Sequence, residues 1–301
     1  MQQAFVELNK VRTKILTWGR WIEESQQGTN EVVILIVGNP GTVGFYETFG
    51  KTLYQQSNIP VWCVGHAGHN FPTENSFTKL PKFSDNKELY SLKGQIEHKV
   101  DFFRKYVPEN AQVHLIGHSV GAYMALEILE HPEVKTKIKD VFLIFPAIEH
   151  IAKTKNGKFL NTFIRPIVWF VVFLTWIFTN LPDCLATFLL YIYMFIANIP
   201  RQLHVENIKQ FLKPGIVKRV LFLGIEEMDF VEERNNDVIR RNVKKVKFCY
   251  GQSDNWTEPA CWENLKADIP EVNCEVSSFE HAFVFNQSTE VACKLADWLK
   301  K

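Results

Sequence analysis

The chain has 301 residues, which is enough for one large α/β domain or for one domain with an insertion. Its 34 Lys and Arg residues balance 33 Asp and Glu residues, so the formal net charge is +1 and nucleic acid is not expected as a partner. The 24 Phe and 8 Trp residues indicate instead a large apolar core or a surface that faces lipid.

The cysteines and the N-terminal residues favour the cytosolic side of the cell. The six cysteines form no C-x-x-C pair and are expected to be reduced thiols. Residues 1–20 carry charges throughout and contain no apolar core of signal-peptide length. The catalytic part is therefore not expected in the secretory lumen.

The first half of the chain alternates apolar runs with helical segments. A weak alternation over 4–8 and 13–18 predicts an opening antiparallel pair of strands. Buried strands are expected at 32–37, 60–64, 113–116 and 141–145, and helices at 45–56, 87–106 and 122–129. Strands that are apolar along their whole length, alternating with helices, predict a mostly parallel central sheet with helices on both faces, which is the α/β class.

The pattern changes between the two halves of the chain. From 166 to 200 the one charged residue is Asp183, and Arg165 and Arg201 bracket the segment. Each of its two apolar arms has about 15 residues, roughly 22 Å as helix, which is short of the ~20 residues that a bilayer span needs. Pro182 before Asp183 predicts a turn between the arms. We expect a single domain over 1–301, with a cap-like insertion at 150–212 that holds an apolar hairpin at 166–200.

The remaining residues return to the character of a water-exposed α/β protein. The expected elements are a charged helix at 226–241, a strand at 246–250, a helix at 259–268, a short strand at 274–276 and a closing helix at 290–300.

A serine between two glycines, in Gly117-His118-Ser119-Val120-Gly121, stands where a predicted strand meets a predicted helix. This spacing is typical of a nucleophile elbow, although a plain structural turn has the same composition. The turn leaves no room for Cβ atoms at its flanks, so glycines stand there and the serine Oγ projects from the corner. The helix that follows directs backbone N–H groups at the same point.

A serine nucleophile needs a base, usually a histidine oriented by a carboxylate, and at such an elbow the chain order is Ser, then Asp or Glu, then His. Asp254 follows the predicted strand at 246–250, and His281 lies in the loop after the last predicted strand. We therefore predict Ser119 as nucleophile, Asp254 as orienting acid and His281 as general base and acid. Glu149 and Asp229 are rival acids, and an Asx turn at Asp254 is the structural alternative.

An oxyanion needs two backbone donors. One is the N–H of Val120, and the other should come from the loop after 32–37. Pro40 has no N–H, so the backbone of Asn39 is the expected second donor.

His66 and His69 are three residues apart, but no third ligand lies nearby in sequence. We favour loop packing for this pair and expect no metal and no other cofactor.

Several motifs together resemble the lipid droplet-associated hydrolases, a branch of the α/β-hydrolase fold. They are Gly38-Asn39-Pro40-Gly41 with Phe45-Tyr46, Gly65-His66-Ala67-Gly68-His69, the run 94–99, the elbow run 115–123 and His281-Ala282-Phe283. The resemblance covers about 30 to 300. It implies a serine hydrolase of lipid esters, sterol esters or acylglycerols, with the triad on Ser119, Asp254 and His281.

The resemblance also implies a place for the apolar segment. The neutral lipid would be the substrate, and the partner would be the lipid droplet monolayer or the endoplasmic reticulum membrane, met from the cytosolic face. Backbone groups in oil must bond internally, so we expect helices at 166–200 that anchor the chain at the lipid surface. A pocket cap or a dimer contact is the alternative for this segment. The alternatives for the whole chain are a weakly active or non-catalytic surface protein and an esterase for small acyl groups.

Overall fold

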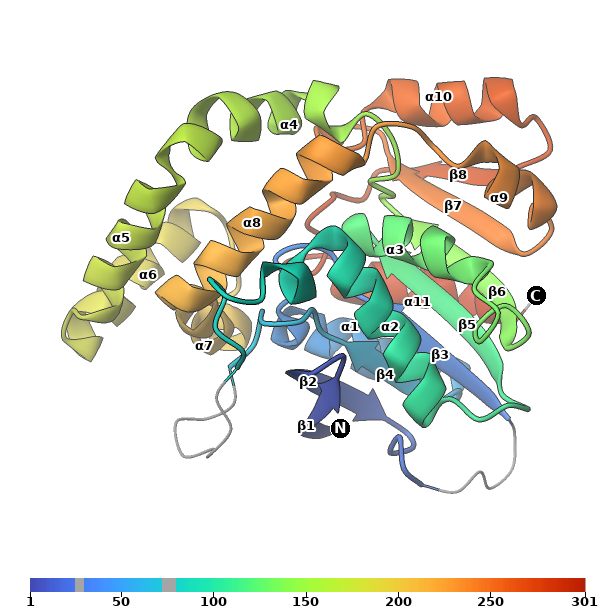
Figure 1. Cartoon of the computed structure of the whole chain (residues 1–301), viewed down its shortest axis with the longest axis horizontal. Coiled ribbons are helices and arrows are strands. Elements are labelled where there is room, and N and C mark those ends of the chain that lie inside the picture. The colour runs from blue at the N-terminus through green and yellow to red at the C-terminus, as the bar shows by residue number, and fades with distance from the viewer. Residues whose placement is uncertain (25–29, 72–79, 301) are drawn as a thin grey trace.

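The computed structural model describes residues 1–24, 30–71 and 80–300. Within them lies one eight-stranded sheet in the order β1-β2-β4-β3-β5-β6-β7-β8 (Figure 1). As predicted, β1 and β2 pair antiparallel; β2 is also antiparallel to β4, and the other neighbours are parallel. The strands are β1 Gln2–Leu8, β2 Val11–Trp18, β3 Glu31–Ile36, β4 Val61–Val64, β5 Gln112–His118, β6 Ile138–Ile144, β7 Val246–Gly251 and β8 Asn273–Ser277.

Both faces of the sheet are covered by helices. The covering helices include α1 Glu47–Ser57, α2 Leu92–Tyr106, α3 Val120–Leu129, α10 Pro259–Asp268 and α11 Ser288–Leu299. Along β3 the even positions pack with α2 and α3, and the odd positions pack with α1 and α11. Because residues 32–37 alternate between two buried faces, all six of them are apolar, and the sequence shows one continuous hydrophobic run.

Two predicted helices begin with a short 3-10 turn. The turn η1 (Val43–Tyr46) precedes α1, and η2 (Lys87–Tyr90) precedes α2. The break before α2 falls at Ser91, whose side chain accepts the Gly94 N–H as an N-cap.

The prediction of a single helix at 226–241 is wrong, because this segment holds the end of one helix and the whole of the next. Helix α8 (Pro214–Phe230) ends just before the buried Val231, and α9 (Asn236–Arg241) begins five residues further on. The Asn235 side chain accepts the Val238 N–H and caps α9. An Asx residue favours such a cap over a helix interior, and the charge pattern did not reveal it.

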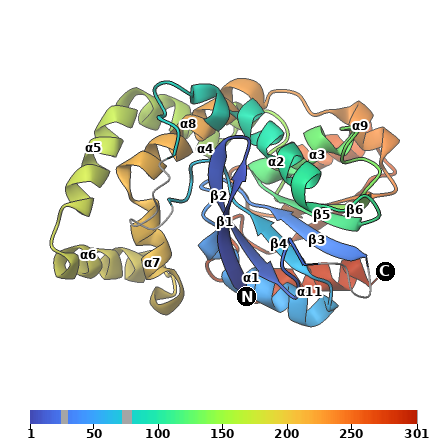
Figure 2. The ribbon, with the colours of Figure 1, turned by 60° about the horizontal axis from the view of Figure 1, so that its bottom comes forward.

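The segment between β6 and β7 forms a helical lobe beside one end of the sheet (Figure 2). Its elements are η3 Ile151–Lys153, α4 Lys155–Phe159, η4 Leu160–Ile164, η5 Arg165–Ile167, α5 Val168–Thr179, α6 Asp183–Ile196, α7 Arg201–Phe211, and then α8. The predicted turn at Pro182 separates α5 from α6. The two helices diverge there, α5 packing on α8 and α6 on α7.

The first apolar arm is longer than the sequence suggested. Helix is continuous over Lys155–Thr179, 25 residues, long and apolar enough to cross a membrane by length and composition. The prediction that each arm is too short is therefore wrong for this one, because the helix starts eleven residues before 166. Helices α6 and α7 pass the same test only as a pair, and they are bent by 120°.

Candidate active site

The elbow is a sharp turn between β5 and α3. Ser119 has φ +54° and ψ −124°, a strained conformation for a residue with a side chain. A Cβ on Gly117 would lie 2.6 Å from the Ala122 Cα, and one on Gly121 would lie 2.4 Å from the Ile36 carbonyl oxygen. Both glycines are therefore required by the close approach of backbone, as the spacing predicts.

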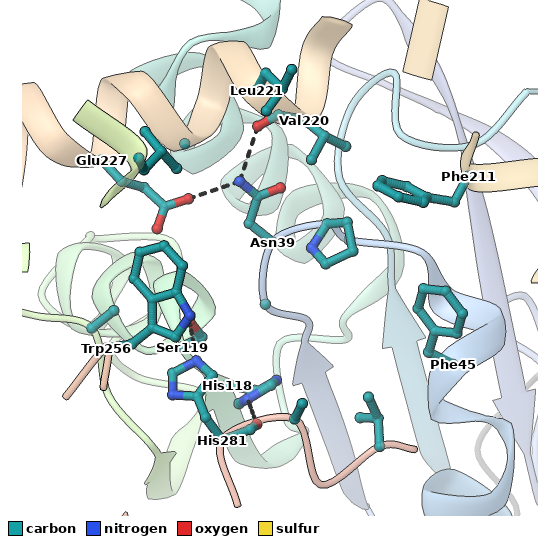
Figure 3. Close-up of a pocket in the computed structure, with 18 of the residues that line it drawn as sticks. Asn39, Phe45, His118, Ser119, Phe211, Val220, Leu221, Glu227, Trp256 and His281 are labelled. Atoms are coloured by element: carbon teal, nitrogen blue, oxygen red, sulfur yellow. Dashed lines mark hydrogen bonds between the residues drawn. The ribbon is translucent and has the colours of Figure 1, made fainter. Parts of the chain in front are cut away.

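The structure brings the three predicted side chains into one chain of hydrogen bonds. His281 Nδ1 lies 2.6 Å from Asp254 Oδ2, and His281 Nε2 lies 3.0 Å from Ser119 Oγ. Because a carboxylate only accepts, Nδ1 carries the proton and Nε2 is free to accept from the serine hydroxyl. Figure 3 shows Ser119 and His281 together at the base of the pocket.

Asp254 is held as an anion. Its Oδ1 accepts the Trp256 N–H at 2.7 Å and the Thr257 N–H at 3.2 Å, and its Oδ2 accepts the Thr257 hydroxyl at 2.7 Å. Burial opposes ionisation, but the hydrogen bonds from His281, Thr257 and Trp256 lower the pKa of Asp254 to about 2.

The rival acids are engaged elsewhere. Glu149 is bonded to Arg234, and burial raises the pKa of the Glu149 carboxyl. Asp229 accepts two hydrogen bonds from the Arg165 guanidinium on the surface, at 2.7 and 2.9 Å. The geometry therefore favours Asp254 over both as the partner of His281.

The two expected oxyanion donors flank the serine. Val120 is the first residue of α3, whose first N–H groups have no partner within the helix. Asn39 lies in the loop after β3 and lines the pocket beside Ser119. Its side-chain Nδ2 donates to the Val220 carbonyl and to Glu227 Oε1, both at 3.0 Å and both on α8.

The pocket above Ser119 is mostly apolar. It has a volume of about 310 Å³, at the small end for ligand sites. The polar side of the wall comes from the end of β5 and from loops that follow strands of the sheet, which carry Asn39, His118, Ser119 and His281. The helical lobe supplies the opposite wall: Leu160, Phe211, Val220, Leu221, Gly224, Glu227 and Met228. Part of this wall lies beyond the predicted insertion boundary at 212; the division itself stays a prediction.

Comparison with known proteins assigns the family. The sequence model described as "Lipid-droplet associated hydrolase" matches residues 29–284. The chain is 38% identical to the lipid droplet-associated hydrolase of Drosophila melanogaster, over 100% of this chain and 99% of that one. The mouse protein of that name is 33% identical over 99% of this chain and 95% of its own. The chain belongs to the lipid droplet-associated hydrolase family.

Solved structures agree on the fold of this family member. An esterase from Exiguobacterium antarcticum superposes with a TM-score of 0.62 over 100% of both chains, at 14% identity. At that identity the likeness concerns the fold, which confirms the predicted α/β-hydrolase architecture. Membership of this family identifies the chain as a hydrolase.

A second chain of hydrogen bonds lies behind the candidate site. His118 Nε2 lies 3.0 Å from the His281 carbonyl oxygen, which can only accept, so Nε2 donates. Its Nδ1 then accepts from the Tyr46 hydroxyl at 2.6 Å, whose oxygen accepts the Gly38 N–H at 2.8 Å. Burial and the nearby His281 lower the pKa of His118 to about 3, so it stays neutral. This chain ties three loops of the site to one another.

The loop at 65–69 packs beneath the Asn39 loop. His69 Nδ1 donates to the Pro40 carbonyl at 2.7 Å, and His66 faces the buried Lys99 Nζ at 3.3 Å. Within the described residues no group of three or more His, Cys, Asp or Glu could hold a metal ion. Burial lowers the pKa of Lys99 to about 7.

Sequence reasoning missed Tyr46 and Glu227. Tyr46 was present in the Phe45-Tyr46 motif, but its contact with the elbow depends on how η1 packs. Glu227 falls in the predicted charged helix at 226–241, and its burial can be seen only from the tertiary structure.

Proposed function

We propose that this chain is a serine hydrolase of lipid esters, sterol esters or acylglycerols, which uses Ser119, Asp254 and His281. The observation that carries the proposal is the continuous hydrogen-bonded order of serine, histidine and carboxylate beneath an apolar pocket. The strained conformation of Ser119 and the anionic character of Asp254 support it.

The proposed mechanism follows from the donor and acceptor roles. Ser119 Oγ attacks the ester carbonyl while His281 Nε2 takes its proton. The tetrahedral oxyanion is bound by the backbone N–H groups of Asn39 and Val120. His281 then gives the proton to the departing alcohol, and a water activated by His281 releases the carboxylic acid from Ser119.

We further propose that the lipid surface meets the helical lobe. Among the described residues, every large hydrophobic side chain that is exposed, apart from Met1 and Phe230, lies between 159 and 203. Trp169 is 71% exposed, and Phe195 and Ile196 are 74% and 76% exposed. Such an apolar face is unfavourable in water and favourable in contact with lipid.

Two charged groups of the helical lobe have close partners. Asp183 is paired with Lys209 at 2.7 Å, and Arg201 lies over the Tyr191 ring at 5.4 Å from its centroid. We propose a location on lipid droplets, which the names of the relatives support, and on the endoplasmic reticulum, in both cases at the cytosolic face. The cysteines, all of them free thiols, fit a reducing compartment.

The exposed lobe also favours a second candidate function, that of a weakly active or non-catalytic surface protein that affects droplet organisation. A fluorophosphonate probe separates the two, because it reacts with an activated serine. Labelling of the wild type, and none of Ser119→Ala, supports the hydrolase; an unlabelled, folded wild type supports the surface protein. A panel of sterol esters and acylglycerols, run with the same pair, then identifies the substrate.

A further inference from the structure

Glu227 is a buried carboxyl in an apolar pocket wall. Its residue is 6% exposed, and it lines the same pocket as Ser119 and His281. Burying a carboxyl away from water without a cation beside it costs free energy, so a carboxyl at this position suggests a specific role.

The contact of Glu227 is with the loop that carries the proposed oxyanion donor. Its Oε1 lies 3.0 Å from Asn39 Nδ2, and the Val220 carbonyl takes the other hydrogen of that nitrogen at 3.0 Å. Positions 220, 224 and 227 lie on one face of α8. Between the two contacts stands Gly224, where a Cβ would come within 3.4 Å of Asn39 Nδ2. Figure 3 shows Glu227 and Val220 reaching Asn39 from the same helix.

The groups around Glu227 favour its uncharged form. Burial raises the pKa of Glu227 to about 8, and the hydrogen bond from Asn39 opposes the shift only in part. The titratable groups of the surrounding segments are engaged with other partners. They are His281 with Asp254, His118 with Tyr46, Glu149 with Arg234, Asp229 with Arg165, and Glu226 with the Leu92 N–H.

We propose that Glu227 is a positioning residue for the hydrolysis: its carboxyl fixes the Asn39 side chain, and so holds the Asn39 backbone N–H where the oxyanion forms. This inference rests on the proposed function. Ionisation of Glu227 would place an anion near the developing oxyanion and disfavour the transition state. Through Glu227, the helical lobe would contribute to the catalytic geometry as well as to the pocket wall.

Three variants test this inference with a soluble p-nitrophenyl ester between pH 6 and 10. Glu227→Gln keeps an acceptor for Asn39 Nδ2 and cannot ionise. Glu227→Met keeps the volume and removes the acceptor. Glu226→Gln removes the neighbouring carboxylate, which lies outside the pocket lining, and is the matched control.

In the wild type, kcat should fall as the pH rises through about 8, the value at which Glu227 ionises. Glu227→Gln should lose this alkaline fall, whereas Glu226→Gln should keep it. Glu227→Met should lower kcat about tenfold with KM within about twofold, less than the 10²–10³ loss for removing an oxyanion donor outright. Glu227→Gln should recover most of that loss at pH 7.

The inference would be overturned if kcat of Glu227→Gln fell at alkaline pH as it does in the wild type. It would also be overturned if Glu227→Met had the wild-type kcat. If Glu227→Met does not fold, the pH profile of Glu227→Gln still decides. Fluorophosphonate labelling of the wild type is read first, because an unlabelled wild type counts against the proposed hydrolase itself and not against Glu227.

Discussion

Asp254→Asn should nearly abolish hydrolysis, because the structure dictates which way the new amide points. The Asp254 Oδ1 position faces two backbone N–H groups, those of Trp256 and Thr257. The amide oxygen of the variant must take that position, since an NH₂ there would leave two buried donors unpaired, at roughly 1–3 kcal/mol each. The amide NH₂ then faces His281 and the Thr257 hydroxyl, in place of Oδ2.

An amide N–H can only donate, so His281 Nδ1 would have to accept and its proton would move to Nε2. In that tautomer His281 cannot take the proton of Ser119 Oγ. The same exchange in a Ser-His-Asp site of another fold lowers kcat by about 10⁴-fold, or ~5.4 kcal/mol in the barrier, and we expect a loss of this order.

The assay is kcat for a soluble p-nitrophenyl ester, with the rate of fluorophosphonate labelling at Ser119 as a second readout. Ser119→Ala sets the background. Asp229→Asn is the matched control, because it changes an exposed carboxylate paired with Arg165. A thermal melt verifies that Asp254→Asn is folded. A variant within tenfold of the wild type, or an equal loss in Asp229→Asn, would refute the reasoning.

Three further predictions concern the surroundings of the site. Tyr46→Phe leaves the Gly38 N–H without its acceptor and His118 without its donor, so the free energy of unfolding in urea should fall by roughly 1–3 kcal/mol; an unchanged midpoint would contradict this. Lys99 has a folded pKa of about 7 against 10.5 for the free side chain, so the unfolded chain binds more protons above pH 7. The wild type should therefore gain about 2 kcal/mol relative to Lys99→Met between pH 7 and 9 in urea titrations, whereas a constant difference would exclude the shift. Replacing Trp169 and Phe173 together by Ser should weaken co-flotation with phospholipid-coated triolein droplets about 100-fold, from the loss of two exposed aromatic rings, with soluble-ester hydrolysis unchanged; equal flotation would argue against lipid contact.

The sheet and the neighbourhood of Ser119 could be predicted from sequence because local rules govern them. A strand buried on both faces has few residue types to choose from, and a turn as tight as the elbow admits only glycine at Gly117 and Gly121. Chain order then selected His281 and Asp254 from a larger set of candidates, and the structure has them in contact. Their catalytic roles remain a prediction.

The helical lobe was harder to predict for a physical reason. Its helices are apolar around most of their surface, so periodicity does not indicate which side packs inward. The start of the first arm at Lys155 was missed because its first residues are polar, and the end of α8 at Phe230 was missed because helix-favouring residues continue past it. The burial of Glu227 could not be predicted for the same reason, since it depends on where α8 crosses the Asn39 loop.

The two walls of the pocket have separate origins in the chain. Ser119 and His281 follow strands of the central sheet, whereas the facing wall of the pocket comes from the single segment between β6 and β7. Mutations in this segment are therefore expected to change which substrate fits the pocket without disturbing Ser119. The hydrogen bonds between α8 and Asn39 limit how far α8 can move. Substrate choice in relatives should accordingly vary with the residues of α7 and α8 more than with those around Ser119.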